Sequence, residues 1–176
     1  MRRVLIIGIS GAGKSTFARA LAERTGLPLI HLDREFWQPG WIATKRDQWR
    51  PKVITLAARE NWIMDGNYDS SLDLRLPRAD TVFWFDYTRL KCLSRAFRRS
   101  LANYGKVRDD MASGCPEQFD PGFARYIWTF NDRQCPAIMR ALREHGGHLE
   151  PVIFRRDGDV RAFLASLSDP SRSDRA

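Results

Sequence analysis

The stretch Gly8-Ile9-Ser10-Gly11-Ala12-Gly13-Lys14-Ser15-Thr16 decides the fold expected of this chain. It satisfies the pattern GxxxxGK[ST], in which glycines let the backbone curl so that successive N–H groups point at phosphate oxygens. The compact apolar run Val4–Ile7 before it is typical of a strand, and a helix is expected to begin near Lys14. Strand, loop and helix in this order define a P-loop, so the sequence predicts a nucleoside triphosphate site.

The chemistry of such a loop gives its residues their expected roles. Backbone amides and the positive end of the helix dipole hold phosphates, and Lys14 is expected to reach the β- and γ-phosphates. The Ser15 hydroxyl is expected to ligate Mg²⁺, so ATP and Mg²⁺ are the predicted cofactors. The predicted nucleotide-binding residues are Gly8, Ser10, Gly11, Ala12, Gly13, Lys14, Ser15 and Thr16.

Aspartates follow three other apolar runs. These runs are Leu29–Leu32 before Asp33, Trp62–Met64 before Asp65, and Thr81–Phe85 before Asp86, and Val152–Phe154 is a plausible fifth strand. Apolar runs that alternate with helical patterns predict an α/β fold with a five-stranded, mainly parallel sheet sandwiched by helices. Ligands of such sheets bind at the carboxyl ends of the strands, so the three carboxylates are expected to converge near the P-loop.

The run that ends in Asp86 resembles a Walker B strand, whose aspartate supports the metal, so Ser15 and Asp86 are the predicted metal residues. A plain strand terminus is the alternative. Tyr87, rather than a glutamate that would activate water, follows it, which argues against a motor-type ATPase. Neither DxxG nor NKxD occurs, which argues against a GTPase. Phosphate transfer to a bound acceptor is the leading interpretation.

Residues 88–101 predict a helix with two different faces. Leu90, Leu93, Phe97 and Leu101 fall on one face, and Lys91, Arg95, Arg98 and Arg99 fall on the other. The basic face is either simply solvated or it supplies arginines that clamp transferring phosphates. Arginine suits the second task because its planar fork meets phosphate oxygens bidentately. We predict that Arg95 and one of Arg98 or Arg99 act in this way.

Two further segments have alternative interpretations. Residues 103–117 are rich in glycine, charge and turn formers, which favours either a lid that brings Lys106 and Arg108 over the phosphates or an ordinary surface loop. Trp37, Trp41 and Trp49 lie close together in the sequence after Asp33. They form either the wall of an acceptor pocket or part of the core.

Composition limits the classes of protein. The 176 residues suit one domain, predicted over 1–167, with a disordered tail over 168–176. No apolar run is long enough to cross a bilayer, and three cysteines without a CxxC pair fit a reducing cytoplasm. The formal charge of +8, from 29 Lys and Arg against 21 Asp and Glu, favours phosphate-bearing partners, either small nucleotides or nucleic acid.

Several motifs together resemble a known family. They are the P-loop, His31-Leu32-Asp33, Trp37-Gln-Pro-Gly-Trp41, Asp65-Gly66-Asn67-Tyr68 and Met111-Ala-Ser-Gly-Cys-Pro-Glu117. With these motifs the chain resembles, from about residue 3 to 167, the bacterial DNA topology modulation proteins (FlaR-like), a branch of adenylate-kinase-like P-loop proteins. The resemblance implies a nucleoside-monophosphate-kinase-like fold with a lid. It also implies that Asp65-Gly66 contacts the acceptor and metal-bound water and that Asp33 corresponds to the aspartate after the second strand. Arg95 and Arg98 or Arg99 correspond to the arginines of the lid helix.

The sequence departs from this pattern at one place. Adenylate kinases carry DGFPR where this chain has Asp65-Gly66-Asn67-Tyr68-Asp69, so the arginine that grips a monophosphate is missing from its usual position. The acceptor therefore need not be AMP.

The sequence as a whole predicts a cytoplasmic ATP-dependent kinase of a small molecule, with a nucleotide or nucleoside among the candidate acceptors. The predicted catalytic residues are Lys14, Asp33, Asp65, Arg95, Arg98 and Arg99. Asp33 is the better candidate to take the acceptor's proton. The alternative is a nucleotide-gated, DNA-associated regulator with weak or no kinase activity, which would bind duplexes in a salt-dependent way.

Overall fold

A computed structural model describes residues 1–167, so the predicted tail over 168–176 lies outside the described residues. Its main sheet has five strands in the order β2-β5-β1-β6-β7, and every neighbouring pair is parallel. The strands are β1 (Arg3–Gly8), β2 (Leu29–His31), β5 (Trp62–Asp65), β6 (Thr81–Phe85) and β7 (Val152–Phe154). The prediction of a five-stranded parallel sheet is confirmed.

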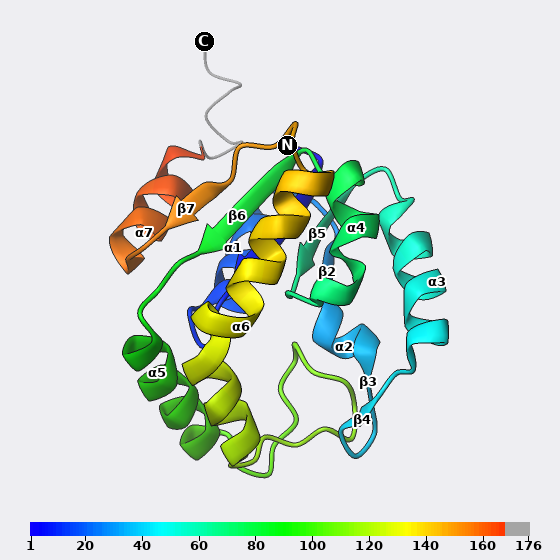
Figure 1. Cartoon of the computed structure of the whole chain (residues 1–176). Coiled ribbons are helices and arrows are strands. Elements are labelled where there is room, and N and C mark those ends of the chain that lie inside the picture. Colours follow the sequence, from blue (N-terminus) through cyan, green and yellow to red (C-terminus); the bar gives the residue numbers. More distant parts are fainter. Residues whose placement is uncertain (168–176) are drawn as a thin grey trace.

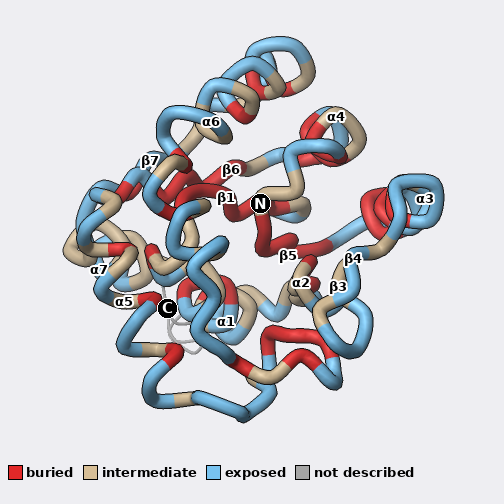
Figure 2. Tube along the Cα trace, turned by 60° about the horizontal axis from the view of Figure 1, so that its bottom comes forward, coloured by how far each residue is buried: buried red, intermediate tan, exposed pale blue. Residues whose placement is uncertain are grey.

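The core lies where the central strands are covered on both faces, as Figure 2 shows for the buried segments in the middle of the molecule. Val4, Leu5, Ile6 and Ile7 of β1 have no exposed surface. Strands of parallel sheets are buried on both sides and therefore form continuous apolar runs, which is why β1, β5 and β6 were recognisable.

Helices flank the sheet on both sides (Figure 1). They are α1 (Lys14–Thr25), α2 (Leu32–Phe36), α3 (Arg46–Ala57), α4 (Leu72–Arg75), α5 (Arg89–Ala102), α6 (Pro121–His145) and α7 (Asp157–Ser166), with short 3₁₀ turns η1 (Asp69–Ser71) and η2 (Leu76–Arg78). Figures 1 and 2 place α4 and α6 over one face and α1 and α7 over the other. This layering brings the carboxyl ends of the strands to one edge, beside α2 and α5.

Two local features differ from the expectation. Leu32 begins α2, so Asp33 lies in the first turn of a short helix and not at a strand end. Trp37–Gln38 (β3) and Ile42–Ala43 (β4) form an antiparallel hairpin, which the sequence pattern had not indicated.

The orientation of α5 corrects the simple interpretation of its apolar stripe. Leu90, Phe97 and Leu101 are 68%, 59% and 63% exposed, whereas the buried residues of the helix are Cys92, Ala96 and Ser100. The inner face carries small residues because the helix approaches the P-loop closely, so that a Cβ placed on Gly11 would lie 2.4 Å from the Cys92 carbonyl oxygen. The close packing of α5 against the P-loop therefore determines which face of the helix is buried, and the larger apolar side chains remain exposed.

No helix within residues 1–167 is long and apolar enough to cross a membrane.

Candidate active site

The P-loop connects β1 to α1 in a conformation that requires glycine. Gly8, Gly11 and Gly13 have φ angles of 129°, 85° and 99°, a region that L side chains rarely adopt. A Cβ on Gly8 would lie 2.3 Å from the Phe85 carbonyl oxygen, so a side chain there would displace β6. The loop therefore leads directly into the start of α1, where Ser15 and Thr16 lie in the first turn.

Lys14 lies inside this loop. Its Nζ donates to the carbonyl oxygens of Gly8 at 2.8 Å and Ile9 at 3.0 Å. Burial lowers the pKa of Lys14, and the nearby carboxylates of Asp65 and Asp33 oppose that shift. A buried ammonium group beside two carboxylates and the start of a helix is suited to receive the negative charge of a polyphosphate.

Asp33 and Asp65 lie together at this edge, as the sequence pattern predicted. Asp33 accepts a hydrogen bond of 2.5 Å from the Tyr68 hydroxyl, and Asp65, only 6% exposed, lies 3.0 Å from Nδ1 of His31. Burial raises the pKa of Asp33, while its bond from Tyr68 and the charge of Lys14 lower it. A carboxylate with a raised pKa next to a lysine is suited to accept a proton.

Asn67 ties the segment after β5 to the P-loop. Its Oδ1 accepts from the Gly8 amide at 2.8 Å, and its Nδ2 donates to the Gly8 carbonyl oxygen at 2.9 Å and to the Tyr126 hydroxyl at 3.3 Å. The side chain thereby fixes the start of the loop by pairing with both backbone groups of one glycine. Sequence reasoning had not assigned this role to Asn67, although its motif was recognised as specific.

Arg75 binds the backbone of the same segment, which follows β5. Its side chain has no exposed surface, and it donates to the carbonyl oxygens of Gly66 at 3.1 Å, Tyr68 at 3.0 Å and also Asn67. Sequence reasoning missed this residue as well, because nothing in its spacing distinguishes it from the many surface arginines. Its donors are occupied by backbone, so it holds Asn67 and Tyr68 in place for the site.

The arginines of α5 differ in how near they lie to the P-loop. Arg95 donates to the P-loop carbonyl oxygen of Ala12 at 3.4 Å and to Asp157 at 2.8 Å. Arg99 acts electrostatically on Lys14, and its Nε is a buried donor that has no hydrogen-bond partner within residues 1–167. Arg98 is exposed, and within residues 1–167 its side chain donates only to the Ser94 carbonyl oxygen of its own helix, at 3.4 Å. Arg95 therefore contacts the loop, and Arg99 is near enough to Lys14 to act on it electrostatically.

Asp86 does not join the cluster. Its side chain is 47% exposed and lies 3.5 Å from Nε of Arg155, in the segment between β7 and α7. The carboxylates that act on Lys14 are those of Asp65 and Asp33. Because β6 ends in an extended segment beside β7, with the Asp86 amide donating to Phe154, its side chain is directed to the β7 side.

The residues around the P-loop fit a Mg²⁺ ion that is held mainly by nucleotide phosphates. Within residues 1–167 no group of three or more His, Cys, Asp or Glu side chains forms a metal cage. Mg²⁺ commonly takes only one or two protein ligands and keeps several waters. Ser15 in the first turn of α1 and the carboxylates beside Lys14 suit that arrangement better than Asp86 does.

The 103–117 segment is docked on the β3–β4 hairpin. Gly40 donates to the Gly114 carbonyl oxygen at 2.8 Å, Trp41 Nε1 donates to Pro116 at 3.0 Å, and Cys115 Sγ donates to Gln38 at 3.1 Å. Two motifs that are far apart in the sequence, residues 37–41 and 111–117, thus recognise each other.

The other end of the 103–117 segment is held by buried ions. Glu117 accepts from Ser100 at 2.7 Å and lies within 2.7 Å of Arg108 and 3.4 Å of Arg99. Arg108 also pairs with Asp110 at 3.1 Å. This network connects the segment to the inner face of α5, directly beside the arginines that approach the P-loop.

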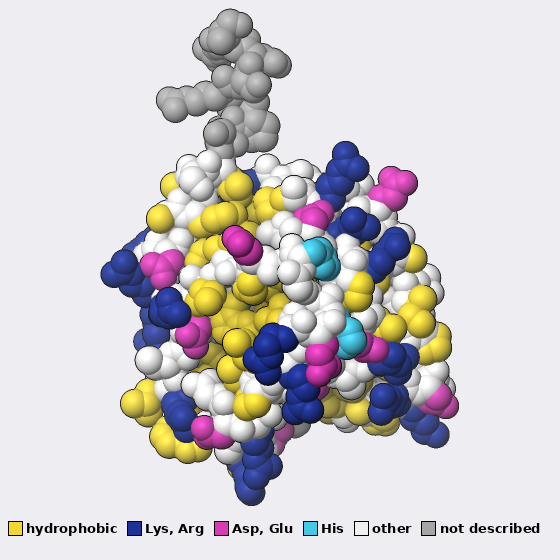
Figure 3. All heavy atoms as spheres, turned by 45° about the horizontal axis from the view of Figure 1, so that its top comes forward, with side chains coloured by type: hydrophobic (Ala, Val, Ile, Leu, Met, Phe, Trp, Pro, Cys, Tyr) yellow, Lys and Arg dark blue, Asp and Glu magenta, His cyan; other side chains and the backbone are white. Residues whose placement is uncertain are grey.

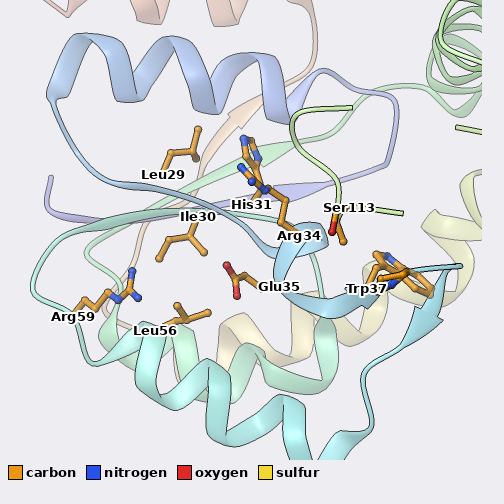
Figure 4. A pocket seen from close by; sticks show the side chains of 11 residues that line it. Leu29, Ile30, His31, Arg34, Glu35, Trp37, Leu56, Arg59 and Ser113 are labelled. Atoms are coloured by element: carbon orange, nitrogen blue, oxygen red, sulfur yellow. The ribbon is translucent and has the colours of Figure 1, made fainter. Parts of the chain in front are cut away.

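A hollow of about 440 Å³ lies at the edge of the sheet beside β2 and α2 (Figure 4). The hairpin region and the 103–117 segment also contribute to its lining, with Trp37, Pro39, Ala112 and Ser113. Arg34 and Arg59 line it together with Leu29 and Leu56, whereas Asp33 does not. His31 lines this hollow too and connects it to the site through Asp65.

Solved structures share this architecture. A shikimate kinase from Bacteroides thetaiotaomicron is 17% identical, with a TM-score of 0.55 over 94% of this chain and 95% of that one. A shikimate kinase from Acinetobacter baumannii in complex with shikimate is 18% identical, with a TM-score of 0.56 over 95% and 90%. A gluconokinase from Sinorhizobium meliloti is 19% identical, with a TM-score of 0.52 over 94% and 91%. No family model and no curated protein sequence matches the chain.

These likenesses confirm the predicted fold class. The chain has the fold of P-loop NTPases of the nucleoside-monophosphate-kinase type, which the neighbouring small-molecule kinases share.

Proposed function

We propose that this protein is an ATP-dependent kinase that transfers the γ-phosphate of Mg·ATP to a hydroxyl group of a small molecule. The observation that carries the proposal is the placement of Lys14 in a P-loop with the carboxylates of Asp33 and Asp65 beside it. Fold neighbours that are kinases of small molecules support the same reaction class. We also propose, from the shared motifs, that the chain is related to the FlaR-like topology modulation proteins.

The proposed reaction divides the work between two sides of the site. On the nucleotide side, the loop amides and Lys14 would hold the phosphates, and Ser15 would help to hold the Mg²⁺ that neutralises phosphate charge. Arg95 and Arg99 would neutralise the charge that spreads over the transferring group. On the acceptor side, Asp33 takes the proton of the attacking hydroxyl, while Asp65 orients the acceptor.

The 103–117 segment is the proposed lid. Its docking on the β3–β4 hairpin would close the acceptor side and exclude water, which matters because water would otherwise compete with the acceptor hydroxyl. Lys106 is also expected over the phosphates, but it is exposed, whereas Arg108 is half-buried and pairs with Glu117 and Asp110.

Arginine variants test the nucleotide side. Replacing Arg99 or Arg95 by alanine is expected to lower kcat by about 100-fold or more, since each would remove a preorganised charge from the transition state. Arg98→Ala is the matched control and is expected to keep kcat within about twofold, because an exposed surface charge contributes little. ADP formation with the best acceptor is the measurement. Equal losses in all three variants would contradict these assignments.

A glycine pair tests the lid. Gly114 and Gly105 both have positive φ angles, 75° and 73°, but only a Cβ on Gly114 would meet a neighbour, the Pro39 Cβ at 2.8 Å. Gly114→Ala is therefore expected to undock the segment and lower kcat/KM by roughly 100-fold, the cost of a misplacement of about 1 Å. Trypsin should also cut the variant faster at Lys106. Gly105→Ala shares the backbone strain without the clash, so identical behaviour of the two variants would contradict a closing role.

The alternative of a DNA-associated regulator receives no support from the fold neighbours, which are small-molecule kinases. On the face shown in Figure 3, Lys and Arg side chains are scattered among acidic and hydrophobic ones and form no continuous basic surface.

A further inference from the structure

The hollow beside β2 and α2 is a cavity that the proposed phosphotransfer does not use. Its volume of about 440 Å³ lies within the range of sites for small ligands, and Figure 4 shows side chains from several elements around it. Among residues 1–167, neither Lys14 nor Asp33 lines it. The hollow is therefore distinct from the reacting groups, and its own side chains indicate what it could bind.

Two arginines give the hollow a positive charge. Arg34 belongs to α2 and Arg59 to the turn after α3, so the two guanidinium groups reach the hollow from different elements (Figure 4). Within residues 1–167 neither side chain forms an ion pair. Arg50 of α3, by contrast, pairs bidentately with Asp73 at 2.7 and 3.0 Å. Arg34 and Arg59 are thus available to an anion from outside the chain.

The carboxylate in the lining is already paired. Glu35 is the one acidic residue that lines the hollow within residues 1–167, and its Oε2 lies 2.7 Å from Nζ of Lys52. Lys52 is held there because it also donates to the Glu35 carbonyl oxygen at 2.7 Å. Since Lys52 offsets the charge of Glu35, the two arginines leave the hollow with an excess of positive charge.

Apolar side chains provide much of the remaining wall. They are Leu29 and Ile30 of β2, Leu56 of α3 and the half-buried Trp37. The Ser113 hydroxyl adds a hydrogen-bond donor. Guanidinium groups recognise phosphates and carboxylates because their planar fork meets two oxygens at once. Together with an aromatic and aliphatic wall, they suit a molecule that has an anionic group on an apolar or aromatic body.

The 103–117 segment closes one side of the hollow. Ala112 and Ser113 line it, and the next residue, Gly114, accepts a hydrogen bond from the Gly40 amide at 2.8 Å. Pro39, beside Gly40, is part of the lining as well. The hollow is therefore complete only while the segment is docked on the β3–β4 hairpin. A ligand that prefers the complete hollow must stabilise the docked segment, and docking must strengthen its binding by the same factor.

We propose that this hollow is a second binding site for a small molecule with a phosphate or carboxylate group on an apolar or aromatic body, and that the bound anion stabilises the docked 103–117 segment. Arg34 and Arg59 hold the anionic group, and Trp37 contacts the body of the ligand. The site is independent of the proposed kinase function, because none of these three residues takes part in the proposed transfer.

Calorimetric titration of the full-length protein tests the site. The P-loop is first filled with saturating Mg·AMP-PNP, so that it cannot take up the added anion. Phenyl phosphate and benzoate represent the two anionic groups, and benzyl alcohol is their uncharged counterpart. At least one of the anions is expected to bind at least about tenfold more tightly than benzyl alcohol, since charge-assisted hydrogen bonds are the strong ones. Binding of neither anion, or equally tight binding of benzyl alcohol, would overturn the proposal.

Charge-matched variants locate the bound anion. The double variant Arg34→Gln/Arg59→Gln removes both guanidinium groups of the hollow. The control Arg19→Gln/Arg133→Gln removes two exposed arginines, of α1 and α6, that do not line it. The first variant is expected to weaken binding of the anion by about 100-fold, from the loss of two charged hydrogen-bond donors, and the control by less than about twofold. Equal affinities in the two variants would place the anion elsewhere and contradict the proposal.

Proteolysis tests the coupling to the 103–117 segment. Saturation with the tighter-binding anion is expected to slow trypsin cleavage after the exposed Lys106 by at least about fivefold, the lower end of the usual coupling between sites. In the reverse direction, Gly114→Ala should weaken binding of the anion more than Gly105→Ala, because only the Cβ on Gly114 would meet Pro39. Unchanged cleavage, or equal affinities in the two glycine variants, would contradict the coupling.

Discussion

Replacement of Lys14 by alanine is expected to reduce phosphotransfer by about 1,000-fold, at the upper end of the loss for one preorganised donor in an electrostatic site. The reason is the position of Nζ, which lies within the curl of the P-loop and bonds the carbonyl oxygens of Gly8 and Ile9. Removing it leaves the loop amides in place but takes away the ammonium group that is placed to neutralise charge on the leaving β-phosphate.

The measurement is ADP formation with the best acceptor, together with the affinity for Mg·ATP. Lys14→Met is the matched variant, because it keeps an apolar stem of similar length in the buried position and loses only the ammonium group. Both variants should be inactive and folded. Substantial activity in Lys14→Met would mean that the ammonium charge does not contribute to the reaction.

Replacement of Asp33 by asparagine is expected to lower kcat by about 100- to 10,000-fold, the usual range for loss of a general base. Asparagine keeps the oxygen that accepts from the Tyr68 hydroxyl, so the hydrogen bond of 2.5 Å can persist while the proton acceptor is lost. Burial raises the pKa of Asp33 above its ordinary value of 3.8, so the acidic limb of the kcat profile should lie above that value. The variant should lose this limb.

Asp33→Asn is expected to increase the stability of the fold although it lowers kcat. A carboxyl whose folded-state pKa is raised binds its proton more tightly in the folded state than in the unfolded state. Its favourable contribution is present below the unfolded pKa and is lost as the pH rises through the folded pKa. At neutral pH, Asp33→Asn should therefore raise the melting temperature while it lowers kcat. A loss of both would indicate a structural role for Asp33 instead.

The parts of this site that were predictable are those encoded by local spacing. The P-loop follows from glycines and a lysine at fixed offsets between a strand and a helix, and Asp33 and Asp65 follow from apolar runs that end at one sheet edge. In each case a short stretch determines its own conformation, so that no distant contact is needed for the prediction.

Other residues could not be placed because their roles depend on tertiary contacts. Arg98 and Arg99 are neighbours on one helix, and only the rotation of α5 about its axis decides which of them reaches the loop. That rotation is set by the small residues that approach Gly11, not by the apolar stripe of the helix. Asp86 likewise ends an apolar run as Asp65 does, but its place next to Arg155 depends on the pairing of β6 with β7.

The role of two motifs became clear only from the contacts between them in the structure. Residues 37–41 and 111–117 were recognisable as specific, yet their mutual hydrogen bonds join positions about 75 residues apart, for example Trp41 and Pro116. Arg75 is a similar case, since an internal arginine that binds three backbone carbonyl groups has the same sequence appearance as a surface one.

The most direct test of the proposed reaction follows the γ-phosphate itself. Wild-type protein is incubated with Mg·[γ-³³P]ATP and a deproteinised small-molecule extract of cells, and the label is traced among ATP, inorganic phosphate and new phosphomonoesters. We predict that the label appears in one phosphomonoester in the same amount as the ADP formed, and that Lys14→Ala abolishes it. Label found only in inorganic phosphate, or retained in ATP despite intact nucleotide binding, would contradict the assignment of this protein as a kinase.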